Sequence, residues 1–318
     1  MFYGLLGGCL WALDTVLLSI AMAPFELEWT APILSTGLHD LFSALWMSGL
    51  ITIKKKWPAI RSALHSKSGW MVMVAALLGG PVGMCGYVFA VQFLGPSLTA
   101  GISAFYPALS ALLCWIFFGQ KLNKTQIAGL CLCLGCIVAM SISGQEQSSH
   151  YALGLIMAVC CVVGWALEGV IVQHSMQEDL DNEICLFLRQ MTSAAAFSFL
   201  IIPLISSWTF GLKVLDTSWL LLLIASFCGT ASYLSYYKAI GLIGANKAMP
   251  LNSTYCAWAV VFAFVLQGTI PTLVQIVLCI GILAGAILCA HEPAASKLSN
   301  LNSRLYTQVY QRPNSSMI

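Results

Sequence analysis

Charged residues are scarce in this chain of 318 residues. They make up 8% of the sequence, whereas hydrophobic residues make up 59%. Ordinary soluble domains contain roughly 25% charged residues, so the composition excludes a typical soluble protein and indicates an integral membrane protein. The formal net charge of +2 is too small for the strong positive field that nucleic-acid binding needs. We therefore expect no nucleic-acid partner.

Cysteine is not scarce, but the pattern that would make it a metal ligand is absent. The thirteen cysteines fall mostly inside apolar runs, where cysteine behaves as a small hydrophobic residue. Cys131 and Cys133 come close to a metal-ligand spacing, yet no nearby histidine or second pair completes a site. We expect reduced packing cysteines, no structural metal and no cofactor.

Long apolar runs are abundant, and a membrane-spanning helix needs about 20 residues. The first run starts without a basic segment and contains Asp14, so we interpret it as a mature helix rather than a signal peptide. The sequence predicts an all-α membrane protein with ten transmembrane helices, near residues 3–23, 32–53, 69–92, 97–118, 124–143, 152–175, 182–204, 216–242, 246–267 and 271–290.

Basic residues gather in particular connections. Lys54, Lys55 and Lys56 follow the second run, whereas the first connection carries Glu26 and Glu28. Because cytoplasmic loops are enriched in Lys and Arg, both termini are expected in the cytoplasm, with the protein in the inner (plasma) membrane.

The chain repeats itself after about 150 residues. LHDLFSA, which starts at Leu38, lies over LRQMTSA, which starts at Leu188, and Tyr106 falls on Tyr255. Five is an odd number of crossings, so the second half would enter the membrane from the opposite side; such inverted repeats are typical of alternating-access transporters. We expect a five-helix repeat in 1–143, a connecting loop in 144–151, a second repeat in 152–290 and a polar, disordered cytoplasmic tail in 291–318.

Two carboxylates interrupt apolar runs in nearly the same word, WALD at residues 11–14 and WALE at residues 165–168. In each word the tryptophan and the acid share a helix face. An ionisable group at this depth costs at least about 2.5 kcal/mol unless it faces a cavity. We expect one polar pocket formed by six residues: Asp14, His39, Asp40, Glu168, Arg189 and Gln190. A structural ion pair between Glu168 and Arg189 is the simpler alternative.

Aromatic residues supply the rest of the predicted pocket. Tyr233 is followed by Tyr236 and Tyr237 on one helix face, and Tyr87, Tyr106 and Tyr255 come from other runs. Such a stripe is usually packing. Combined with buried acids, however, the rings favour an organic cation, which binds aromatic faces by cation–π attraction and takes its counter-charge from a carboxylate.

Several words of the sequence resemble a known group of proteins. They resemble the EamA-like drug/metabolite transporter superfamily, and within it the bacterial choline transporters. The words are GLLGGCLWALD, LHDLFSALW, GGPVGM, GWALEGVI, FLRQMTS and SYLSYYKAI. The resemblance covers nearly all of residues 1–290 and implies choline uptake. It places these residues at family positions: Trp11, His39, Trp165, Glu168, Gln190, Tyr233 and Tyr236. Asp14 departs from the family, in which a small uncharged residue is expected.

We therefore expect a transporter, not an enzyme, that imports choline or a related quaternary ammonium. The expected binding residues are Trp11, His39, Tyr87, Tyr106, Trp165, Glu168, Gln190, Tyr233, Tyr236 and Tyr255. Glu168 is the expected counter-charge, and Asp14, His39 and Asp40 are candidates for tuning it or for carrying a coupling proton. Two alternatives remain: an exporter of amino acids or drug-like metabolites on the same scaffold, and an intramembrane enzyme that uses His39, Asp40 and Glu168 as acid and base.

Overall fold

The computed structural model describes residues 1–25, 27–141, 151–178 and 180–291. Within these ranges the chain is helical and contains no strand. The predicted loop and tail lie outside the described residues, apart from Tyr151, which begins a helix, and His291, which follows the last one.

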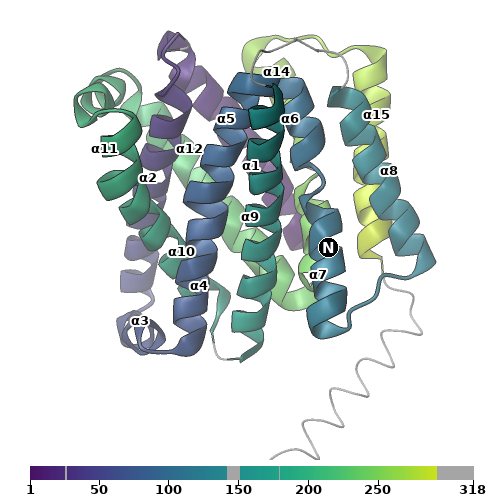
Figure 1. The fold of residues 1–318 in the computed structure, drawn as a ribbon, viewed down its shortest axis with the longest axis horizontal. Coiled ribbons are helices and arrows are strands. Elements are labelled where there is room, and N and C mark those ends of the chain that lie inside the picture. Colours follow the sequence, from purple (N-terminus) through teal and green to yellow (C-terminus); the bar gives the residue numbers. More distant parts are fainter. Residues whose placement is uncertain (26, 142–150, 179, 292–318) are drawn as a thin grey trace, which may run out of the picture.

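A helix occupies each of the ten predicted ranges (Figure 1). The first five ranges contain α1 (Phe2–Met22) with η1 (Ala23–Phe25), α2 (Ala31–Ile53), then α3 (Trp57–Leu64) before α4 (Lys67–Leu77), η2 (Leu78–Met84) and α5 (Cys85–Leu94), next α6 (Pro96–Ser103) with α7 (Tyr106–Phe118), and α8 (Lys124–Ser141). The other five contain α9 (Tyr151–Glu178), α10 (Asn182–Ala196) with η3 (Phe197–Ile201) and α11 (Ile202–Ile205), α12 (Trp208–Ile243), α13 (Ala245–Asn252) with α14 (Tyr255–Gln267), and α15 (Leu273–Ala290).

Nine helical segments in the described part of the chain are long and apolar enough to cross a membrane. The tenth predicted span, α2, has 23 residues but is not among these nine. His39 and Asp40 stand in its middle and lower its hydropathy. The helix nevertheless packs between α10 and α12.

The last three segments of each half have the same layout. α6, α7 and α8 have 8, 13 and 18 residues, and α13, α14 and α15 have the same lengths. Gly95 precedes α6 with φ +79°, and Gly244 precedes α13 with φ +83°. Only glycine adopts such angles readily, so the turn into the fourth segment of each half depends on this residue.

Close helix packing brings the two halves together. α1 runs along α12, where the Ser232 hydroxyl donates to the Gly7 carbonyl at 2.7 Å. α2 lies against α10, and α8 against α15. In Figure 1, α1, α2, α9, α10 and α12 lie at the centre and left of the bundle, while α8 and α15 stand at its right edge.

Ion pairs connect the halves where α2 ends. Lys56 Nζ lies 2.8 Å from Glu183 Oε2 and also pairs with Asp181, while Lys54 pairs with Glu183. These residues join the α2–α3 connection to the start of α10. All thirteen cysteines lie in the described ranges and are free, as the sequence predicts.

Candidate functional site

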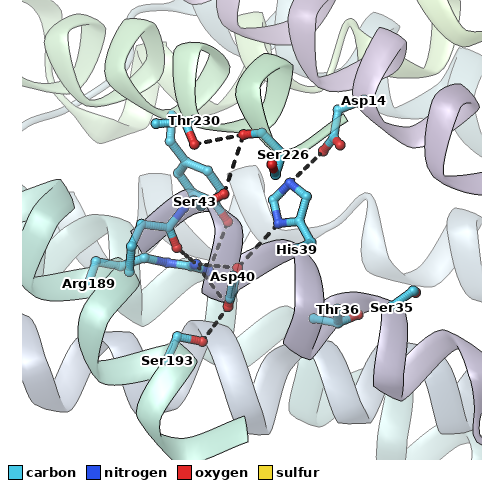
Figure 2. A network of polar contacts seen from close by, with 12 residues as sticks. Asp14, Ser35, Thr36, His39, Asp40, Ser43, Arg189, Ser193, Ser226 and Thr230 are labelled. Atoms are coloured by element: carbon cyan, nitrogen blue, oxygen red, sulfur yellow. Dashed lines mark hydrogen bonds and ion pairs between the residues drawn. The ribbon is translucent and has the colours of Figure 1, made fainter. Parts of the chain in front are cut away.

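Five ionisable side chains form a continuous line of polar contacts inside the bundle, most of it visible in Figure 2. Asp14 Oδ2 lies 3.2 Å from His39 Nε2, and His39 Nδ1 lies 3.4 Å from Asp40 Oδ1. Arg189 Nη1 lies 3.3 Å from Asp40 Oδ1, and Arg189 Nε donates to Glu168 Oε1 at 3.0 Å. No member is more than 6% exposed. The line therefore joins α1, α2, α10 and α9 through buried charges.

Arg189 is the best-satisfied member of this line. Besides the two carboxylates, it donates to Gln190 Oε1 at 2.6 Å and to the Tyr233 hydroxyl at 2.9 Å. Its guanidinium also lies 4.5 Å from the centre of the Tyr233 ring. A buried charge needs such partners, because an unpaired one is strongly unfavourable. The ion pair between Arg189 and Glu168, which the sequence offered as the simpler alternative, is present.

The line contains more acidic than basic side chains. Asp14, Asp40 and Glu168 contribute three carboxyl groups, against one guanidinium and the imidazole of His39. When all three carboxyl groups are ionised, they outnumber the cations whether or not His39 holds a proton. A positively charged ligand would offset such a buried excess of negative charge.

Glycines of the GGPVGM word make room for this arrangement. The word forms η2, a π-helical segment that contains Pro81. A Cβ on Gly79 would overlap the Glu168 carboxylate, and a Cβ on Gly83 would lie 2.8 Å from the Trp165 ring. These glycines therefore allow η2 to approach α9 closely.

One cavity, the Glu168 cavity, has walls from α1, α7, α9, α12, α13 and α14, and its empty space of about 540 Å³ includes a part that is open to the outside. Glu168 Oε1 there also accepts a hydrogen bond from the Tyr237 hydroxyl at 3.0 Å. The cavity is lined by Trp11, Tyr106, Trp165, Glu168, Gly169, Ser232, Tyr233, Tyr236, Tyr237, Asn252 and Tyr255.

A second cavity, the Asp14 cavity, has an empty space of about 660 Å³ that also includes a part open to the outside. It extends along the later turns of α1 and the early turns of α2, towards the end of the bundle where these helices connect. It is lined by Trp11, Asp14, Thr15, Leu18, Thr36, His39, Asp40, Met84, Tyr87, Trp165, Arg189, Tyr233 and Tyr255.

Four aromatic side chains line both cavities: Trp11, Trp165, Tyr233 and Tyr255. The rings of Trp11 and Tyr233 meet edge to face, with centroids 5.2 Å apart. Trp165 stacks on Tyr87 at 5.6 Å. The cavities are therefore neighbours with a shared aromatic wall.

The structure brings most of the predicted residues together but divides the single predicted pocket into two. Glu168 faces one cavity, whereas Asp14, His39, Asp40 and Arg189 face the other. Gln190 lines neither cavity, and its side-chain oxygen accepts a hydrogen bond from Arg189. All other predicted binding residues line at least one cavity.

Some lining residues were absent from the predicted set. Tyr237 belongs to the tyrosine stripe, and its spacing from Tyr233 was a usable signal. Asn252 and Ser232 gave no such signal, since isolated small polar residues are common in helices. In the described ranges, no group of three His, Cys, Asp or Glu residues could hold a metal ion.

The sequence is similar to those of known transporters. A model of the EamA-like transporter family matches residues 1–142 and again 152–290. Protein LicB of Haemophilus influenzae is 26% identical over 297 residues, covering 93% of this chain and 98% of LicB. An uncharacterized transporter of Bacillus subtilis, YvbV, is 24% identical over 173 residues, covering 54% of this chain and 53% of YvbV.

A solved crystal structure shares the fold, with a TM-score of 0.72 over 91% of this chain and 95% of the other, at 18% identity. The two family matches together cover most of the sequence and leave out only the central connection and the C-terminal segment. The chain therefore belongs to the EamA-like transporter family of the drug/metabolite transporter superfamily, and it is a multi-pass membrane transporter.

Proposed function

We propose that this transporter imports choline or a closely related quaternary ammonium by alternating access. The observation that carries the proposal is the pair of neighbouring aromatic cavities along a buried line of side chains in which three acids face two basic groups. A quaternary ammonium has no N–H to donate, so rings and a carboxylate suit it better than amides do. The resemblance of GGPVGM and LRQMTS to bacterial choline transporters points to the same substrate.

In this proposal the Glu168 cavity holds the cation against rings, with Glu168 as counter-charge. Trp11, Trp165, Tyr233 and Tyr236 all line it. Glu168 is shared with Arg189 and Tyr237, so an arriving cation competes with Arg189 for this carboxylate. Arg189 keeps Asp40 as a second partner, which lowers the cost of releasing Glu168.

We also propose ten transmembrane helices in two inverted five-helix repeats, 1–143 and 152–290, with both termini in the cytoplasm. The separate family matches to each half support this division, as do the matched lengths of the last three segments. The lysines at the end of α2 support the orientation.

Alternating access needs one closed end. The pairs of Lys54 and Lys56 with Asp181 and Glu183 tie the two proposed repeats together where α2 ends. The Asp14 cavity extends towards the opposite end. We propose that this is a state closed towards the cytoplasm.

The test is uptake of radiolabelled choline into proteoliposomes that contain the purified protein, compared with protein-free liposomes. We expect saturable uptake that excess unlabelled choline suppresses and that excess neutral amino acid does not. Equal uptake in both preparations would refute the proposal, and suppression by amino acids would favour an exporter of amino acids.

A further inference from the structure

We propose that the Asp14 cavity is a second binding site for a choline-class cation, anchored by Asp14 and separate from the site at Glu168. The inference rests on the proposed function, because it takes the substrate class from there. It assigns to Asp14 a direct contact with substrate.

The first observation is a carboxylate oxygen without a partner. Asp14 is 1% exposed, and its Oδ1 atom has no hydrogen-bond partner among the described residues, although Asp14 lines the cavity. A buried polar atom left unpaired is costly. Such an atom at a cavity wall indicates a ligand that satisfies it.

Comparison of the three carboxylates singles out Asp14. Glu168 accepts from Arg189 and Tyr237, and Asp40 is paired with Arg189 and accepts from Ser193 at 2.5 Å. Among the described residues, Asp14 has one charged or hydrogen-bonding side-chain neighbour, the imidazole of His39, 3.2 Å from its other oxygen. Its charge is therefore the least compensated of the three.

The walls of the cavity fit the head group of such a cation. Trp11, Tyr87, Trp165, Tyr233 and Tyr255 supply five aromatic rings. Rings attract a methylated ammonium, and the attraction is largest away from water. The hydroxyl of choline can donate to the free Oδ1 of Asp14, so one molecule would satisfy both features.

The fold makes space for the Asp14 side chain. A Cβ on Gly229 of α12 would lie 2.9 Å from Asp14 Oδ2 and would overlap the His39 ring. α12 thus approaches α1 and α2 closely only because this position is glycine. A carboxylate at position 14 with this glycine opposite it is a feature of this chain's own sequence.

Two sites in series follow from the shared wall. Trp11 and Tyr233 touch edge to face between the cavities. A cation that enters at the Asp14 cavity would pass this pair to reach Glu168. The chain of contacts through His39, Asp40 and Arg189 connects the two carboxylates electrostatically.

Equilibrium dialysis of the purified full chain with radiolabelled choline tests the proposal. We expect two bound choline molecules per wild-type chain.

Asp14→Asn removes charge while keeping shape, and we expect it to weaken one site on the order of thirtyfold or more while leaving the other unchanged. Glu168→Gln should weaken the other site instead. Asp216→Asn makes the same chemical change at an exposed position of α12 outside both cavities, and it should retain both sites.

Thermal unfolding separates binding from a structural role. A Asp14→Asn protein with wild-type stability and one lost site supports the proposal. If Asp14→Asn lowers stability, Asp14→Glu is the second test, because it keeps the charge and should retain choline in the second site. The proposal is overturned if neither variant loses the second site. One wild-type site that Asp14→Asn leaves unchanged would also overturn it, even if choline uptake is intact. Conversely, the protein could bind two molecules of tetramethylammonium and yet show no choline uptake. That result would refute the proposed substrate but would still support the second binding site.

Discussion

At the scale of single residues, the site combines a few charges with many rings. Glu168 is held by Arg189 and Tyr237, so its orientation is fixed before a ligand arrives. Trp11 and Trp165 line both cavities and are two of the four aromatic residues that form the shared wall. These contacts allow separate predictions for charge and for ring.

Glu168→Gln should abolish most choline binding in the Glu168 cavity, since the substitution removes the charge and preserves the shape. Uptake into proteoliposomes should fall with it. Calorimetric titration measures the affinity, and Glu178→Gln, at the far end of the same helix and outside both cavities, is the matched control. Wild-type affinity in Glu168→Gln would show that Glu168 is only a structural partner of Arg189.

Trp11→Ala and Trp165→Ala should each weaken choline binding by about 0.5–2 kcal/mol through lost cation–π attraction. Phenylalanine at either position should recover part of the loss, because it keeps a ring face. Trp219→Ala, at an exposed position of α12, should bind choline like the wild type. If phenylalanine performs no better than alanine, the indoles serve packing rather than cation binding.

At the scale of elements, glycines determine which helices pack closely against each other, and capping residues determine where a helix begins. η2 lies against α9 because Gly79 and Gly83 leave room for Glu168 and Trp165. Asp181 caps the N-terminus of α10, because its side chain accepts a hydrogen bond from the Ile184 backbone N–H at 2.9 Å.

Gly79→Ala should reduce choline binding severely, because the added methyl group would overlap the Glu168 carboxylate and displace it. Gly49→Ala is the control: it lies in α2 with no other atom within 4 Å of the added Cβ, and it should stabilise the helix by about 0.5–1 kcal/mol. Titration with choline and thermal unfolding measure both effects. Wild-type binding by Gly79→Ala would mean that η2 can move away without loss.

Asp181 links the start of α10 to Lys56, outside the membrane-spanning segments. Partial burial would raise the pKa of Asp181, but hydrogen bonds from Lys56 and the Ile184 backbone outweigh it and hold the pKa below its usual value. The carboxylate therefore stabilises the fold fully above its usual pKa, and this stabilisation is lost as the pH falls through the lowered value.

Asp181→Ala should lower the free energy of unfolding by about 0.5–2 kcal/mol, as expected for loss of an N-cap. Asp181→Asn keeps a capping oxygen and loses the ion pair with Lys56, so it should cost less. Thermal unfolding in detergent at several pH values measures the difference between wild type and Asp181→Asn. That difference should shrink at acidic pH, and a constant difference would argue against a role for the charge.

At the scale of the whole molecule, a cation transporter without a second substrate can use the membrane potential. One elementary charge gains about 2.3 kcal/mol per 100 mV. If a proton and choline simply competed for one carboxylate, the transporter would exchange them. Protons moving inward down their gradient would then drive choline outward. For the proposed choline uptake we therefore favour a mechanism driven by the membrane potential.

Choline should accumulate in proteoliposomes with a potassium diffusion potential, inside negative, and no pH gradient. At 100 mV the expected accumulation at equilibrium is about fiftyfold. Radiolabelled choline with and without valinomycin measures it, and collapse of the potential should release the accumulated label. If a pH gradient proves necessary, a coupling proton at His39 and Asp40 becomes the better mechanism.

The sequence by itself determined the membrane class, the helix in each predicted range and the residues that supply rings and acids. Apolar runs and the charges within them are local features, and an ionisable group such as Asp14 or Glu168 at that depth is costly unless it faces an interior cavity. The word GGPVGM contributed only to the family resemblance, and its structural role became clear from its contact with α9.

The tertiary structure alone decided which charges meet. Arg189 contacts Glu168, 21 positions away in the chain, and Asp40, 149 positions away, and no local pattern specifies such distances. The same packing divided the expected pocket into two cavities and left Asp14 Oδ1 without a partner among the described residues. A sequence shows that a carboxylate will be buried; only the approach of helices from both halves, set by glycines such as Gly79 and Gly229, determines which group neutralises it.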